Sequence, residues 1–210
     1  MAVKPILFNT EMVRAILDGR KDATRRIVKG FIPNDAVWGY TAFTPKGYIS
    51  CRGTFADGYG EKFFKLPCEP GNILYVRETW KKAPNGYYYY EDWQKNVIAD
   101  ITKWKPSIHM PKEAARIWLK VTDVRVERLQ DITPKGAESE GVGNLFYDDI
   151  GYGEKNYGTE VDTEYGIAKE QFAWLWESTI KKSDLDRYGW DANPWVWVIE
   201  FERCEKPEEI

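Results

Sequence analysis

Cysteine and histidine are scarce in this 210-residue sequence, and their scarcity excludes several classes of protein. The three cysteines, Cys51, Cys68 and Cys204, are widely spaced and form no CxxC pair, and His109 is the single histidine. A structural zinc site and a disulfide framework are therefore not expected. A Ser-His-Asp or Cys-His mechanism would have to use His109, which we interpret as an ordinary loop residue. P-loop, dinucleotide-binding and nucleophile-elbow motifs are also missing, so we expect no metal and no cofactor.

The sequence also lacks a long hydrophobic run. None of its apolar stretches approaches the roughly 20 residues that cross a bilayer. The N-terminal segment MAVKPILFNTEMV does not have the basic, apolar and small-residue order of a signal peptide. We therefore expect a cytoplasmic protein with no membrane partner. Hydrophobic residues are 43% of the chain and charged residues 30%, which is enough apolar mass for one folded domain over residues 1–210.

Charge is distributed unevenly along the chain, although the formal net charge is only −3. Residues 14–29 contain six basic and two acidic side chains, and residues 103–128 contain seven basic and three acidic ones. Residues 138–170 contain nine acidic and two basic ones. If the two basic segments converge in the fold, they form a local patch that attracts phosphate; solvated surface segments are the alternative.

Aromatic residues are abundant, with 10 Trp and 13 Tyr. Such rings fill hydrophobic cores and also stack on nucleobases, and a Trp-rich core is the better interpretation for most of them. Trp190 and Trp195 flank a predicted turn at residues 191–194, and they are the best candidates for the aromatic wall of a binding site.

The order of the predicted elements favours an α+β protein, a small mixed β-barrel with flanking helices. Thr10 is expected to cap a helix that ends before Gly19. Further predicted helices cover residues 112–116, 134–140 and 168–180, and the clearest strands cover 73–80, 117–129 and 195–201, with a bulge near 122–123. Long insertions are expected at about 30–70, 85–110 and 143–166, the last as a surface loop.

The segment Gly19-Arg20-Lys21-Asp22-Ala23-Thr24-Arg25-Arg26 is the most informative one for chemistry. If the chain is extended after the helix, Thr24 and Arg26 project from the same side, and Lys21 folds back over that side. A threonine hydroxyl becomes a nucleophile when a base removes its proton, and a lysine is such a base when burial or neighbouring cations lower its pKa. Arg20, Arg25 and Arg26 supply neighbouring cations, and the same arginines could hold an oxyanion or a phosphate. A solvated basic turn fits the same spacing.

Residues 16–26 resemble the signature of the ASCH family within the PUA-like superfamily. The segments 70–80, 121–133 and 137–141 and the final strand at 195–201 follow in the order of that family. Arg77-Glu78-Thr79-Trp80 and Trp190-Asp191-Ala192-Asn193-Pro194-Trp195 are most similar to phage-encoded and prophage-encoded ASCH proteins. Together these segments cover less than half of the chain.

The resemblance implies a PUA-like barrel with a cleft that faces the basic turn. It also implies the activity of a small bacterial member, an amidohydrolase (a hydrolase) that removes the acetyl group from N4-acetylcytidine. On this resemblance Lys21 is the base, Thr24 the nucleophile, Glu140 the group that assists proton transfer, and Arg26 a supporting contact. Asp22 stands where close relatives usually have threonine, and an acid there would favour the charged form of Lys21.

Three further functions stay open alongside the enzyme. The same cleft could belong to a non-catalytic RNA-binding or modified-base-binding module, or to a ribonuclease, and an interaction protein of phage origin would need none of these residues. A nucleoside or RNA is the expected partner of the enzyme, of the binding module and of the ribonuclease. Glu78 is expected near the cleft and is a candidate for substrate binding with Arg20, Arg25, Arg26, Trp190 and Trp195; a buried ion pair is the alternative for Glu78.

Overall fold

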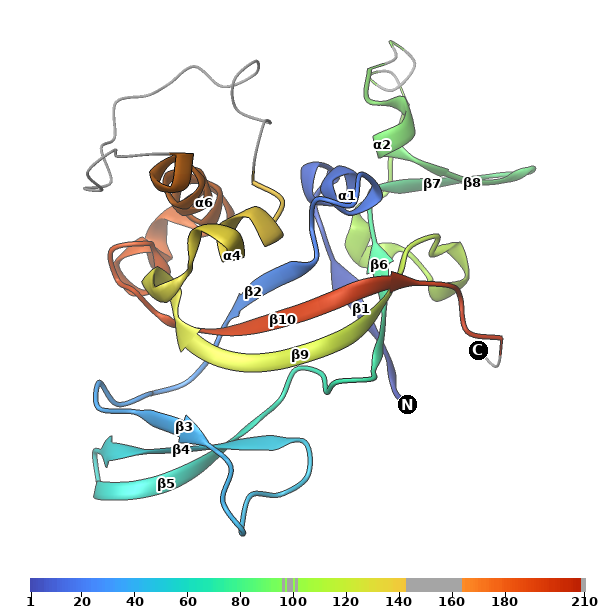
Figure 1. Cartoon of the computed structure of the whole chain (residues 1–210). Coiled ribbons are helices and arrows are strands. Elements are labelled where there is room, and N and C mark those ends of the chain that lie inside the picture. The colour runs from blue at the N-terminus through green and yellow to red at the C-terminus, as the bar shows by residue number, and fades with distance from the viewer. Residues whose placement is uncertain (96, 98–99, 101, 143–163, 209–210) are drawn as a thin grey trace.

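The computed structural model describes residues 1–95, 97, 100, 102–142 and 164–208. Its centre is a five-stranded sheet in which one pair, β1 with β6, is parallel and the other pairs are antiparallel (Figure 1). In spatial order the strands are β1 (Val3–Leu7), β6 (Ile73–Arg77), β9 (Trp118–Arg128), β10 (Trp195–Cys204) and β2 (Ala23–Ile27). The predicted α+β class is confirmed.

The two edge strands of this sheet, β1 and β2, are not joined by backbone pairing within the described residues. They are linked instead through a side chain, because Nη2 of Arg26 on β2 donates a hydrogen bond of 2.9 Å to the carbonyl oxygen of Leu7 on β1. The described sheet is therefore not a closed barrel.

β9 and β10 pair along most of their length and carry much of the core. The pairing shifts at one point, where Glu200 lies opposite Asp123 but Phe201 lies opposite Val121. Thr122 is therefore the extra residue of a β-bulge, which confirms the predicted irregularity.

The segment 30–70 forms a separate three-stranded sheet that lies against the opposite side of the main sheet from α4 and α6 (Figure 1). Trp38 of this small sheet packs edge-on against Trp195 and Trp197 of β10, with ring centroids 5.7 Å and 6.3 Å apart. Residues 80–93 form a hairpin and a short helix. The bounds are β3 (Val37–Gly39), β4 (Tyr48–Phe55), β5 (Gly58–Lys65), β7 (Trp80–Ala83), β8 (Gly86–Tyr89) and α2 (Tyr90–Trp93).

The strand predicted over 73–80 is thus two strands, since β6 ends at Arg77 and β7 begins at Trp80. The insertion predicted at 143–166 lies mostly outside the described residues. The helix predicted at 112–116 is a short 3₁₀ turn. The 3₁₀ turns are η1 (Ser107–His109), η2 (Lys112–Ala114), η3 (Leu129–Asp131) and η4 (Lys182–Asp184).

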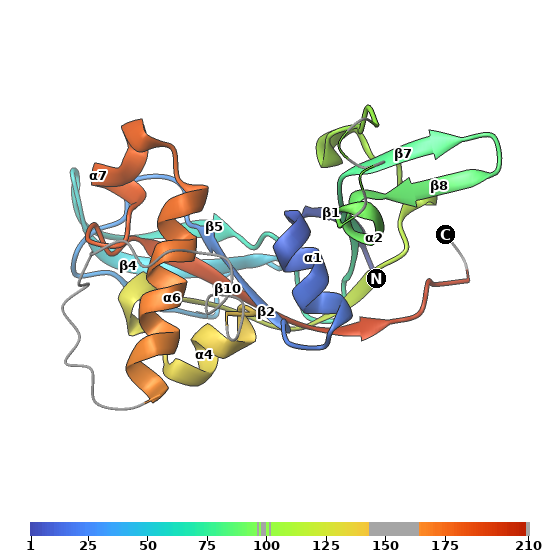
Figure 2. The same cartoon turned by 90° about the horizontal axis from the view of Figure 1, so that it is seen from above.

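The helices α1 (Thr10–Leu17), α4 (Pro134–Ser139), α6 (Glu164–Thr179) and α7 (Leu185–Tyr188) lie on one side of the main sheet (Figure 2). Phe172 and Trp176 of α6 pack with Val196 and Val198 of β10 in a second core cluster. Among the described residues, no helix has the length and hydropathy that a membrane span requires.

The cap of α1 differs from the sequence prediction. The side chain of Asn9, not of Thr10, accepts a hydrogen bond of 2.8 Å from the backbone N–H of Met12. Asn and Thr side chains both accept hydrogen bonds from the unpaired N–H groups of a first turn. The sequence therefore offers two adjacent candidates for the N-cap, and the backbone conformation before the helix decides between them. The effect of the correction is to begin the helix at Thr10 itself.

Candidate functional site

A tight turn joins α1 to β2 and positions the basic segment. Gly19 has a φ of +74°, in the left-handed region that favours glycine. The backbone N–H groups of Arg20 and Lys21 both donate to the carbonyl oxygen of Ala15, at 2.8 Å and 3.1 Å. These bonds close the end of the helix and direct the chain into β2, which begins at Ala23. The segment is therefore extended from Ala23 onward, as the proposed shared side of Thr24 and Arg26 requires.

The end of α4 packs directly on this turn. Lys21 and Glu140 form an isolated antiparallel bridge, and Glu140 is the C-cap residue of α4. Gly141 follows with a φ of +85°, and a Cβ atom there would lie 2.7 Å from Cβ of Ala15 and 3.1 Å from Cβ of Lys21. Only glycine permits so close an approach of the two segments.

A buried ion pair results from this approach. Nζ of Lys21 lies 2.6 Å from Oε2 of Glu140, and the two side chains are 0% and 3% exposed. The same Nζ also donates to the backbone oxygens of Ala23 at 2.7 Å and of Glu140 at 2.9 Å. The three hydrogens of the ammonium therefore have three acceptors.

Burial lowers the pKa of Lys21 from its ordinary value, because a charged amine loses its hydration there; Glu140 opposes the shift, and Arg26 and Arg25 add to it. Asp22 is exposed, and its backbone N–H donates to the carbonyl oxygen of Ser139 at 3.0 Å. The carboxylate that governs the charge of Lys21 is thus Glu140.

Arg25 completes the buried cluster. Its Nη2 lies 2.6 Å from Oε1 of Glu127, and its Nη1 lies 3.3 Å from Oε1 of Glu140. Nη1 also donates to the carbonyl oxygen of Gly136 at 3.3 Å. Lys21, Arg25, Glu127 and Glu140 together carry two positive and two negative formal charges, so the cluster is balanced and its members are held in fixed positions.

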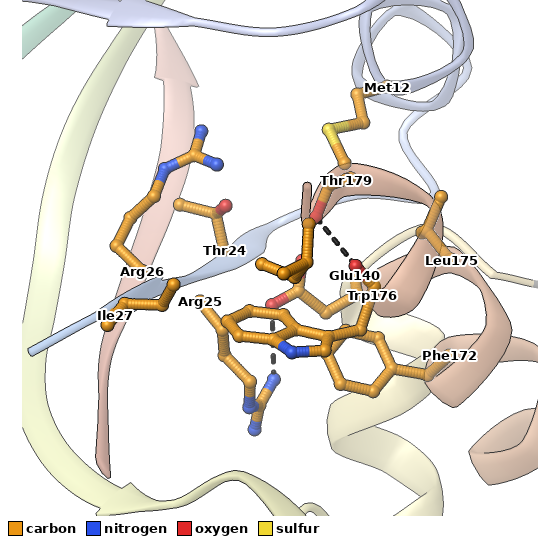
Figure 3. A pocket seen from close by; sticks show the side chains of 11 residues that line it. Met12, Thr24, Arg25, Arg26, Ile27, Glu140, Phe172, Leu175, Trp176 and Thr179 are labelled. Carbon is orange, nitrogen blue, oxygen red and sulfur yellow. Dashed lines mark hydrogen bonds and ion pairs between the residues drawn. The ribbon is translucent and has the colours of Figure 1, made fainter. Parts of the chain in front are cut away.

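A cavity of about 220 Å³ opens beside this cluster, between β2, α1, the end of α4 and α6; we call it the Thr24 cavity (Figure 3). Thr24, Arg26 and Glu140 contribute its polar wall. Within the described part of the chain, no hydrogen bond uses the Thr24 hydroxyl, although the residue is only 1% exposed. The cavity is lined by Met12, Thr24, Arg25, Arg26, Ile27, Glu140, Phe172, Leu175, Trp176, Thr179 and Ile180.

Lys21 is not among the residues that line this cavity. Its ammonium lies behind Glu140, whose carboxylate contacts Lys21 through Oε2 and Arg25 through Oε1. The arrangement can transfer a proton between the buried amine and the carboxylate over 2.6 Å, and it places a carboxylate and a free hydroxyl in one cavity wall. These are the components of general acid–base and nucleophilic chemistry.

Two charged residues expected at the site lie elsewhere. Arg20 donates to the carbonyl oxygen of Gly141 at 3.0 Å and pairs with Asp18, away from the cavity lining. Glu78 is 2% exposed and forms a bidentate pair with Arg116, both contacts being 2.9 Å. Burial raises the pKa of the Glu78 carboxyl, and Arg116 opposes this shift. Of the two predictions for Glu78, the position agrees with the buried ion pair and not with a place at the cavity.

The two expected wall tryptophans and the histidine also lie outside the cavity lining. Trp190 is 6% exposed and packs edge-on against Phe172, with ring centroids 6.3 Å apart. Trp195 packs against Trp38 on the opposite side of the sheet. His109 is exposed in η1.

The apolar wall comes mainly from α6, which sequence reasoning did not connect with the site. Phe172 and Trp176 supply aromatic rings, 6.2 Å apart between centroids, and Leu175, Thr179 and Ile180 extend the wall along the helix. The periodic apolar residues of 168–180 predicted a buried helix face. They carried no information about which part of the sheet that face would cover.

Among the described residues, no group of three or more His, Cys, Asp or Glu side chains has an arrangement that could hold a metal ion. Comparison of the chain with protein-family models, with curated proteins and with solved structures found no match in any of the three.

Proposed function

We propose that this chain is an ASCH-type protein of the PUA-like superfamily, and that its Thr24 cavity binds the base of a nucleoside and hydrolyses an amide on it. N4-acylcytidine is the proposed substrate class. The turn after α1, with Lys21, Thr24 and Arg26 at the spacing of the ASCH signature, supports the proposal. The hydrogen bond from Arg26 to Leu7 supports the barrel part of it, because it links the two edge strands that a PUA-like barrel would bring together.

One observation carries the proposal. The hydroxyl of Thr24, which has no hydrogen-bond partner in the described chain, shares a cavity wall with the carboxylate of Glu140, which is ion-paired to a fully buried lysine. The cavity volume of about 220 Å³ is below the roughly 300–1,000 Å³ of sites for drug-sized ligands. It suits a single pyrimidine ring between the β2 side chains and the rings of Phe172 and Trp176.

In the proposed reaction, Oγ1 of Thr24 forms a bond to the amide carbonyl carbon while its proton leaves to the Lys21–Glu140 pair. The guanidinium of Arg26 stabilises the oxyanion. The C–N bond then breaks, and the exocyclic nitrogen takes a proton from the same pair. Water hydrolyses the acyl-threonine ester, so that N4-acetylcytidine and water give cytidine and acetate.

The proton pathway follows from the contacts of Lys21. An ammonium with three acceptors has no lone pair to act as a base, so Lys21 must first pass a proton to Oε2 of Glu140, 2.6 Å away. Its lowered pKa favours that transfer. The proton of Thr24 then goes to Glu140, which lines the cavity, while Glu140 returns the proton on Oε2 to Lys21. Lys21 is thus the final base and Glu140 the proton shuttle.

The test is to follow the ultraviolet absorbance of N4-acetylcytidine as acetate is released. We expect turnover by the native protein and a loss of at least about a thousandfold in Thr24→Ala, since removal of a catalytic nucleophile elsewhere costs up to about 10⁶. Thr122→Ala is the matched control, because Thr122 is an exposed residue at the bulge of β9. Turnover that survives in Thr24→Ala would refute the assignment of the nucleophile.

A base-binding module without turnover is the second candidate, and the saturation of Lys21 favours it. With three acceptors around Nζ and two cations on Glu140, the cluster is well suited to a fixed role in structure and binding. Binding of intact N4-acetylcytidine by the native protein, with no acetate released, would favour this function. Cleavage of a cytidine-containing RNA under the same conditions would instead indicate a ribonuclease.

A further inference from the structure

A second cavity, of about 540 Å³, adjoins the two edge strands of the main sheet, and we call it the cationic cavity. Three basic side chains line it, and none of the described residues in its lining is acidic. The lining consists of Lys4, Pro5, Ile6, Leu7, Arg26, Pro67, Cys68, Leu74, Arg77 and Ile199. Arg26 belongs to both cavities.

The positive charge of this cavity is not neutralised by ion pairs. Lys4 donates to the carbonyl oxygen of Pro67 at 2.8 Å, Arg26 to that of Leu7 at 2.9 Å, and Arg77 to that of Ile108 at 3.2 Å. All three acceptors are neutral backbone groups. Within the described part of the chain, none of the three cations lies in an ion pair with a carboxylate. This contrasts with the balanced cluster around Lys21.

Arg77 also has donor capacity that the described protein does not use. Its Nε is buried and has no hydrogen-bond partner, which is uncommon for a guanidinium nitrogen in a folded protein. The guanidinium lies over the ring of Tyr75, 5.5 Å from the centroid, so its position is fixed by stacking. A guanidinium held in this way, with no carboxylate ion pair in the described part of the chain, is suited to binding an oxyanion.

We propose that the cationic cavity binds a phosphate group, and that the ligand of this protein is therefore a nucleotide or an RNA residue rather than a free nucleoside. This inference extends the proposed function, on which it rests for the position of the base. Arg26 lines both cavities, which we take to be neighbours, so that a base in the Thr24 cavity and a phosphate near Lys4 and Arg77 would belong to one molecule. The volume of about 540 Å³ lies in the range of sites that hold small ligands.

The test compares the binding of cytidine, cytidine 5′-monophosphate, a cytidine dinucleotide and inorganic phosphate by isothermal titration calorimetry. We expect the monophosphate or the dinucleotide to bind about tenfold to a hundredfold more tightly than cytidine, as a charge-assisted contact predicts. The monophosphate represents a terminal phosphate and the dinucleotide an internal phosphodiester. Equal binding of all three cytidine compounds would overturn the proposal.

The variants assign the preference to the cationic cavity. In the Lys4→Gln/Arg77→Gln double variant, the tighter binding of the phosphorylated ligands should disappear. A Lys4→Gln/Arg77→Lys variant keeps the charge at position 77 and should retain part of that tighter binding. The matched control is Arg52→Gln/Lys65→Gln, which removes two cations from exposed positions of β4 and β5. An advantage that survives in the Lys4 and Arg77 double variant, or that is lost equally in the control, would contradict the assignment.

Two further measurements keep this test independent of folding and of catalysis. A thermal melt of each variant reports its folding, and Lys4→Gln alone, a change at a partly exposed side chain, should reduce the preference even if the double variant unfolds. Inorganic phosphate should bind to the native protein and not to the folded double variant, whether or not acetate is released from N4-acetylcytidine. Phosphate binding without turnover would overturn the enzyme alone, and turnover without any preference for phosphorylated ligands would overturn the cationic site alone.

Discussion

Replacement of Glu140 by glutamine tests the buried cluster most directly. Glutamine keeps the shape of the side chain but removes the negative charge that faces Lys21 at 2.6 Å and Arg25 at 3.3 Å. Both cations are at most 2% exposed, so water does not replace the lost carboxylate. Removing one partner of a buried ion pair lowers the free energy of unfolding by about 3–5 kcal/mol in other proteins. We expect a decrease in that range for Glu140→Gln at pH 7.

The assay is equilibrium unfolding in urea, with Glu202→Gln as the control. Glu202 pairs with Lys120 at 3.3 Å, but the two side chains are 57% and 52% exposed. Solvent screens such a pair, and its removal should change the free energy of unfolding by less than about 1 kcal/mol. A loss below about 1 kcal/mol in Glu140→Gln as well would refute the view that the cluster depends on this carboxylate.

The pH dependence of the same variant gives a second measurement. Burial already lowers the pKa of Lys21 in the folded protein, and Glu140 raises it, so Glu140→Gln should lower it further. Between that lowered pKa and the ordinary 10.5, the unfolded chain binds the proton and the folded protein does not, so stability rises with pH in this window. The destabilisation of Glu140→Gln relative to the native protein should therefore shrink as the pH rises from the Lys21 pKa of the variant to the higher Lys21 pKa of the native protein. A constant or growing difference would show that Lys21 does not titrate as described.

Two other predictions address the packing at Gly141 and the three thiols. Gly141→Ala should cost at least about 2 kcal/mol in urea unfolding, because the new Cβ meets an atom at 2.7 Å and the φ is positive, while Gly60→Ala, with nothing within 4 Å, should cost less than half as much; equal losses would contradict the close approach. In the native protein at pH 8, a thiol reagent should label Cys204 first, because Cys51 and Cys68 are buried and burial raises the pKa of both thiols to about 11. Rapid labelling of all three without denaturant would count against the described core.

The local part of the site follows from sequence, because it depends on short-range rules. The helix stop at Gly19 predicts a polar turn over 20–26 and a strand from Ile27, and Thr24 and Arg26 share one side only if the chain is extended before that; the structure has the strand earlier, at Ala23–Ile27. The helix over 134–140 also follows from its signals, which are Asp131 or Thr133 as the predicted N-cap and Pro134 near the first position; the structure has Thr133 as the cap. The prediction that Lys21 and Glu140 lie close together comes from the family resemblance. No pattern in the residues themselves links these two segments.

The rest of the site required the tertiary fold. Phe172 and Trp176, about 150 positions after Thr24, form the aromatic wall of the cavity. Helical periodicity predicts that one face of their helix is buried, but it does not predict which part of the sheet that face covers. Trp190 and Trp195 were the more conspicuous candidates because they flank a turn, but they fill the core on either side of β10. Composition alone does not distinguish an aromatic residue in a core from one in a cavity wall.

Glu78 illustrates the same limit for charges. Arg77 is its neighbour in sequence, yet adjacent side chains of an extended segment point in opposite directions. The partner of Glu78 is therefore Arg116, which lies 38 positions away, and this leaves Arg77 without a carboxylate. The Arg77 guanidinium in the cationic cavity thus has no ion pair in the described part of the chain because of strand alternation together with the long-range Glu78–Arg116 pair.

The two cavities differ in charge in a way that bears on ligand selection. In the Thr24 cavity, Arg25 is paired with the carboxylates of Glu127 and Glu140. Arg26, which also lines the cationic cavity, is the lining cation that has no carboxylate ion pair among the described residues, so a neutral base on the Glu140 side would meet no uncompensated charge. Beyond Arg26, the positive charge has only carbonyl dipoles as partners, and a neutral ligand group there would leave that charge unmatched. A ligand that is uncharged at its base and anionic at its sugar fits both environments in one orientation only. Such an arrangement would fix the position of the base relative to Thr24 through the phosphate, with no base-specific hydrogen bond needed to set it.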